Sequence, residues 1–98
     1  METTHVRREM SISHEDFLRT FPKAMGDMSY DIDDKHRQIT GHDDGKQLEI
    51  KLSNEGERDI GSLELPVTFV DMDFSGFNEQ EIDAFFINWD LNFQRIGG

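Results

Sequence analysis

The sequence contains no cysteine, and none of its apolar runs is long. Without cysteine, the chain cannot form disulfides, thiolate metal sites or a cysteine nucleophile. It also lacks the stretch of about 20 apolar residues that a membrane helix requires, and the shorter apolar stretch of a secretion signal. We therefore expect a cytoplasmic protein that does not insert into membranes.

Basic residues are scarce, with 10 lysines and arginines against 21 aspartates and glutamates, and the formal net charge is −11. A negative field repels phosphate backbones and anionic lipid headgroups, because basic groups supply the attraction in both cases. We expect neither nucleic-acid binding nor membrane binding. Three roles remain open for the charge: contact with a basic protein partner, binding of a cation, or simple maintenance of solubility.

Sequence signatures of catalysis are missing too. No serine stands between glycines in a strand-turn-helix setting, and no glycine-rich loop of the phosphate-binding kind is present. We expect a protein that is not an enzyme, and we assign no catalytic residue and no cofactor.

The residues that are present suffice for one small domain. Hydrophobic residues make up 35% of the 98 positions, and eight of them are phenylalanine. A chain of this length has room for a single core. We expect a single α+β domain over residues 12–98. Residues 1–11 are polar, charged and without periodicity, so we expect a disordered leader or a tag-like segment there.

The first helix signal lies in residues 11–25, "SISHEDFLRTFPKAM". Ser13 can accept a hydrogen bond from the amide of Asp16, three residues later, as helix caps do. A helix is therefore predicted to start directly after Ser13. Pro22 removes an amide and clashes with the preceding turn, so we expect a break or kink there. Gly26 is expected to end the helix.

Between residues 28 and 74 the apolar period changes to two, which predicts strands. Three of them are expected over residues 29–33, 37–42 and 47–53. The pair Asp44 and Gly45 favours a tight hairpin turn between the second and the third. Pro66 cannot donate to a strand ladder and is expected to split the following segment into two strands.

The stretch "DMDFSGFNEQEID", residues 71–83, allows two interpretations. Asp71, Asp73 and Ser75 occupy the first three ligand positions of an EF-hand calcium loop. Its twelfth position needs a bidentate carboxylate, but here it is Ile82. We therefore favour the second interpretation, in which a strand leads directly into a helix.

That helix is predicted to begin with a capping box formed by Asn78 and Glu81. It is expected to run to residue 96 with one apolar stripe facing the core, made of Ile82, Phe85, Phe86, Trp89, Phe93 and Ile96. A second, smaller apolar patch lies on the opposite side at positions i, i+3 and i+7. Its members are Ala84, Ile87 and Leu91. This patch either packs on the first helix or forms a surface for a protein partner.

Two acidic segments could in principle bind a cation. One contains His36, His42, Asp43 and Asp44, and the other contains Asp31, Asp33 and Asp34. Strand residues six positions apart are separated by ~20 Å, so one ion bridges His36 and His42 only if the chain turns between them. Neither segment has a complete ligand set, and we assign no metal site.

The expected order of helix, antiparallel strands and helix, in an acidic chain, resembles the layout of frataxin. That family binds iron through an acidic ridge and contacts cluster-assembly proteins. The resemblance implies cation binding, but it concerns the layout only, and no site residue follows from it.

Together these features predict an α+β two-layer sandwich. It should have a mainly antiparallel sheet of 4–5 strands, with an N-terminal and a C-terminal helix on one face. As function we expect a non-enzymatic protein-interaction module with a basic partner, present as a monomer or a weak homodimer. The alternative is an acidic cation-binding protein with a frataxin-like layout.

Overall fold

The computed structural model describes residues 3–33, 35, 37–54, 56–60 and 63–93. Two helices and six strands lie in these residues. In chain order they are β1 (Thr3–Met10), α1 (His14–Ala24), β2 (Ser29–Asp33), β3 (Gln38–Asp43), β4 (Lys46–Leu52), β5 (Gly56–Ile60), β6 (Leu63–Ser75) and α2 (Glu79–Phe93).

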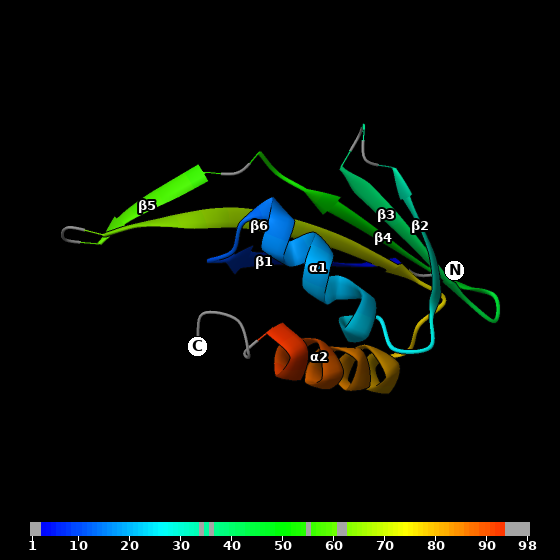
Figure 1. The fold of residues 1–98 in the computed structure, drawn as a ribbon. Helices are drawn as coiled ribbons and strands as arrows, with labels where there is room; N and C mark the ends of the chain where they lie inside the picture. The colour runs from blue at the N-terminus through cyan, green and yellow to red at the C-terminus, as the bar shows by residue number, and fades with distance from the viewer. Residues whose placement is uncertain (1–2, 34, 36, 55, 61–62, 94–98) are drawn as a thin grey trace.

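The strands form an antiparallel sheet in the order β1-β6-β4-β3-β2, and β5 pairs with the first part of β6. The predicted α+β class, with an antiparallel sheet and two helices, is confirmed. β5 and the first part of β6 extend away from the rest as a two-stranded arm (Figure 1), and the molecule measures 46 × 28 × 22 Å. β1 and β2 are the two edges of the sheet.

Strand β1 replaces the disordered leader that we expected over residues 1–11. It pairs with β6 along its whole length, from Thr3 opposite Ser75 to Met10 opposite Thr68. Two features explain why the sequence did not predict this strand. Its half-buried positions include Arg8 between apolar residues, which interrupts the alternation. Its partner strand also lies far away in the sequence, and such pairing is invisible to local propensity.

Helix α1 begins as predicted, because the amide of Asp16 donates to Ser13 Oγ at 3.2 Å. The break expected at Pro22 does not occur, since the helix continues to Ala24. Pro22 lies in the last turn and is exposed, so few helical bonds depend on it.

The hairpin between β3 and β4 also forms as predicted. Asp44 and Gly45 have φ values of 45° and 82°, which suit its two-residue turn. The split expected at Pro66 is wrong, because β6 is one continuous strand of 13 residues. β1 covers β6 only from Thr68 onwards, so Pro66 lies where one side of β6 has no neighbour in the described residues. Proline is tolerated at such an edge.

The core is formed by side chains of both helices and of alternate positions on the strands. Its largest fully buried members are Trp89, Phe17, Phe21, Phe74, Ile39, Leu48, Ile50 and Met72. Trp89 is 1% exposed, as expected, and its ring lies 4.6 Å from that of Phe93 and 5.7 Å from that of Phe17. This aromatic cluster joins α2 to α1.

Candidate functional site

Helix α2 carries the predicted partner surface, and its first turn is held firmly. The amide of Asn78 donates to Glu81 Oε1 at 2.9 Å, and the amide of Glu81 donates to Asn78 Oδ1 at 2.8 Å, which confirms the capping box. The other oxygen of Glu81 accepts a hydrogen bond from Lys46 of β4. The bond from the Asn78 amide, and then the one from Lys46, lower the pKa of Glu81. The bond to Glu81 in turn raises the pKa of Lys46.

Two further contacts hold the flanks of α2. On one flank the Arg8 guanidinium donates to Asp90 Oδ1 at 3.0 Å and lies 4.2 Å from the ring centroid of Phe86. On the other flank the Asn88 side chain donates to the backbone oxygen of Ala24 at 3.1 Å. Ile82, Trp89 and Phe93 of its core stripe are buried as well, so within the described residues the outward side of α2 is the one that remains exposed.

That outward side carries Ala84, Ile87 and Leu91, which we call the α2 patch. Ile87 is 66% exposed and Leu91 is 58% exposed, and Ala84 is exposed too. The alternative that this patch packs on α1 is therefore wrong. Helix α1 is contacted instead through Trp89 and Phe93.

The charge on α2 is entirely negative within Glu79–Phe93. Four acidic residues and no lysine or arginine occur there, and the acids are Glu79, Glu81, Asp83 and Asp90. Glu81 and Asp90 form ion pairs with Lys46 and Arg8. Glu79 and Asp83 are exposed, so the charge beside the α2 patch is acidic.

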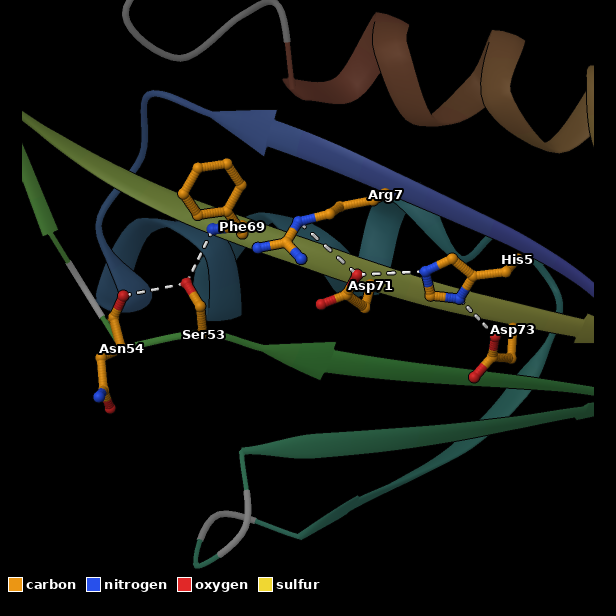
Figure 2. Close-up of polar contacts among 7 residues, drawn as sticks. All are labelled: His5, Arg7, Ser53, Asn54, Phe69, Asp71 and Asp73. Atoms are coloured by element: carbon orange, nitrogen blue, oxygen red, sulfur yellow. Dashed lines mark hydrogen bonds and ion pairs between the residues drawn. The ribbon is translucent and has the colours of Figure 1, made fainter.

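The carboxylates of the calcium-loop interpretation lie on β6, in a regular strand. Figure 2 shows Asp71 and Asp73 side by side, both directed at His5 of β1. His5 Nδ1 lies 2.6 Å from Asp73 Oδ1, and His5 Nε2 lies 3.3 Å from Asp71 Oδ1. The hydrogen bond to Asp73 is the main reason why the pKa of His5 is raised. Both ring nitrogens face carboxylates, so the geometry suits a protonated imidazole between two carboxylates and is not that of a calcium loop.

Arg7 extends this group along the same strand pair. Its Nε lies 3.9 Å from Asp71 Oδ1, and its guanidinium lies 4.6 Å from the ring centroid of Phe69 (Figure 2). The side chains of His5, Arg7, Asp71 and Asp73 form what we call the charged ladder. The sequence did contain a signal for it, namely two basic and two acidic residues, each pair spaced at i and i+2.

The other cation candidates remain apart. His42 Nε2 lies 3.9 Å from Asp31 Oδ2 across the β2-β3 pair, while Asp43 and Asp44 are exposed at the hairpin. Asp34 and His36 lie outside the described residues. Among the residues that the structure describes, no three potential ligands are grouped so that they could hold a metal ion.

Comparison of the chain with family models, with curated proteins and with solved structures finds no significant match. The expected order of helix, antiparallel strands and helix is present from α1 onwards, but β1 precedes the first helix. Within the described residues, neither helix is long and apolar enough to cross a membrane.

Proposed function

We propose that the chain is a small, non-enzymatic protein-interaction module, and that the α2 patch docks on a partner whose apolar contact is rimmed by basic residues. The observation that carries this proposal is the exposure of Ile87 and Leu91 on a helix whose core side is buried and whose two flanks contact other described residues. Two large apolar side chains on such a rigid support lose little conformational entropy when a partner covers them.

The size of the α2 patch favours weak, reversible binding. Covering an exposed Leu or Ile side chain contributes about 1.5 to 3 kcal/mol. Three side chains bury far less than the roughly 800 Å² per partner of a standard stable interface. The same size also fits a chain that is a monomer or a weak homodimer by itself.

The charge specifies the partner's chemistry. Glu79 and Asp83 flank the patch, and the whole chain carries a formal net charge of −11. A basic rim on the partner would be attracted over a distance of about one Debye length and would raise the association rate. Binding should therefore weaken as salt is added.

We also infer that both helices cover the same face of the sheet, which leaves the face with the charged ladder open. The support is the pairing of Leu48 with Phe74 and of Ile50 with Met72, because these buried residues share one cluster with side chains of both helices. The α2 patch then lies on the far side of the helix layer from the sheet, where a partner can approach it without meeting a strand.

The test compares binding to proteins from the native cell by the wild type and by the double variant Ile87→Asp, Leu91→Asp. The matched control is Gln47→Asp, Asn54→Asp, which adds the same two charges at exposed positions away from α2. We expect a specific partner to bind the wild type and the control but not the α2 variant. All three proteins should unfold at the same temperature, because each substituted residue is exposed.

Equal binding by all three proteins would overturn the α2 patch as the docking surface. Titration with calcium, iron(II) and zinc, followed by amide shifts, addresses the competing cation hypothesis. Saturable shifts centred on Asp31, Asp33 and His42 would favour it over the interaction module.

A further inference from the structure

Strand β2 is an edge of the sheet, and its outer side is open in the described residues. It pairs only with β3, through all five positions from Ser29 opposite His42 to Asp33 opposite Gln38. An edge strand presents unpaired N–H and C=O groups along its free side, which can accept another extended chain. Figure 1 shows β2 at one limit of the sheet, with β3 and β4 following it inwards.

A small apolar pocket lies beside this edge, on the side of the sheet that α1 covers. Its apolar lining is Leu18 of α1, Ile32 of β2 and, as the floor, Ile39 and Leu52; the polar side of the lining is His14, Asp33, Arg37 and Gln38. The floor residues are buried, whereas Leu18 is 36% exposed and Ile32 is 45% exposed. The two exposed side chains border a site that an apolar group could fill.

The opposite side of β2 is acidic. Asp31 is exposed, and its only described ion-pair partner is His42, at 3.9 Å. Residues alternate between the two faces of a strand, so β2 offers an apolar side at Ile32 and an anionic side at Asp31. The complementary ligand is an extended chain in which apolar residues alternate with basic ones.

We propose that β2 accepts an extended segment of a partner protein as an additional strand. An apolar side chain of that segment enters the pocket between Leu18 and Ile32, while its basic side chains face Asp31. Main-chain hydrogen bonds supply the attachment, and the pocket and the carboxylate select the sequence. This site is separate from the α2 patch and goes beyond the function proposed for it.

The other edge does not fit the same ligand. β1 carries His5, Arg7 and Arg8, which would repel a basic segment. The pocket near the start of β1 is lined largely by polar residues, among them Asn78, Glu79 and Asp83. The combination of an open edge, an apolar pocket and an anionic face occurs at β2.

The probe is a seven-residue synthetic peptide with capped ends, in which lysine alternates with isoleucine. Two further versions carry backbone N-methyl groups on alternate residues, one in each phase, so that each version blocks hydrogen bonding along one edge of the peptide. Binding is followed by amide shifts of the isotope-labelled protein. We expect saturable shifts at Ser29–Asp33 and at Leu18, and only one N-methylated version should lose binding.

Protein variants sharpen the test. Ile32→Lys should weaken peptide binding at least about tenfold, because it removes the pocket wall and adds a like charge, and Asp31→Lys should do the same through charge alone. The matched control Ile87→Lys adds the same charge on the α2 patch and should bind the peptide almost as the wild type does.

Four results would overturn the proposal. The first is the absence of saturable shifts at millimolar peptide. The second is equal binding of both N-methylated versions, which would mean charge attraction without strand addition. The third is a set of shifts confined to the α2 patch, which would retain the proposed function and discard the β2 site. A mass in solution that doubles with concentration, and that Asp31→Lys abolishes, would identify a second copy of this chain as the occupant of the β2 edge in place of a partner protein.

Discussion

The two edges of the sheet are held in different ways. β1 has eight residues, and its basic side chains contact acids on both faces: His5 meets β6 on one face, and Arg8 meets Asp90 of α2 on the other. β2 has five residues, and its main side-chain contact with a helix is the ring of Tyr30 against that of Phe21, at 4.9 Å. β1 therefore has ion pairs to β6 and to α2 in addition to its longer ladder, whereas β2 has a shorter ladder and an aromatic contact.

The two edges also differ in whether their charged side chains are paired within the chain. His5 and Arg8 of β1 pair with acids of β6 and α2, so much of the charge of this edge is balanced within the chain. At β2 the carboxylate of Asp31 faces solvent. An edge whose charged side chains are already paired offers a partner few contacts. An edge with an exposed charge and an adjacent pocket offers a partner both.

The largest effect on the free energy of unfolding should come from removing a large side chain of the core. Trp89 is buried between the helices and contacts rings of Phe17 and Phe93. Trp89→Ala should reduce the free energy of unfolding by about 3 to 5 kcal/mol, because it deletes a large buried ring and leaves a cavity. Denaturant unfolding followed by circular dichroism measures this loss.

Leu91→Ala on the same helix is the control and should change stability by less than about 0.5 kcal/mol. Similar losses for both variants would mean that the outward and inward sides of α2 have been assigned wrongly.

The sequence predicted the elements whose signals are local. The cap at Ser13, the capping box of Asn78 and Glu81, and the turn at Asp44 and Gly45 each lie within four consecutive residues, and all three form as predicted. These motifs satisfy their own backbone groups, so they depend little on the rest of the chain.

What the sequence did not predict depends on distant pairing. β1 becomes a strand only because β6 lies beside it, and Pro66 is tolerated only because β1 ends before reaching it. Of the candidate surfaces, the α2 patch followed from helical spacing, although its exposure was one of two alternatives. The pocket at β2 joins residues of α1, β2, β3 and β4, so it could not be recognised before the order of strands was known.

A smaller effect on stability should distinguish the side chains on the two faces of β1. The adjacent residues Arg8 and Arg7 have side chains that are 37% and 59% exposed. Arg8→Ala should reduce stability by about 1 kcal/mol, because it removes a partly exposed ion pair and a cation-π contact with Phe86. Arg7→Ala should cost about 0.5 kcal/mol, since its ion pair is long and its contact with Phe69 is made by a more exposed side chain. Hydrogen exchange of the β1 amides, together with equilibrium unfolding, measures both. A larger loss for Arg7→Ala would mean that the open face, and not α2, secures this edge.

The smallest effect should be a pH dependence that is confined to β1. The hydrogen bond from His5 to Asp73 raises the pKa of His5 above its ordinary value of about 6.5. A group whose pKa is raised by folding binds its proton more tightly in the folded state. The resulting stability is fully present below the ordinary pKa and is lost as the pH rises through the raised one. The protection of β1 amides, corrected for the intrinsic pH dependence of exchange, should therefore fall relative to that of β2 amides as the pH rises above about 6.5.

His5→Gln should remove this fall while leaving the β2 amides unchanged. A carbon-13 titration that gives His5 a pKa at or below its ordinary value would contradict a protonated His5 between the two carboxylates, and β1 would then be held by its ladder and by Arg7 and Arg8.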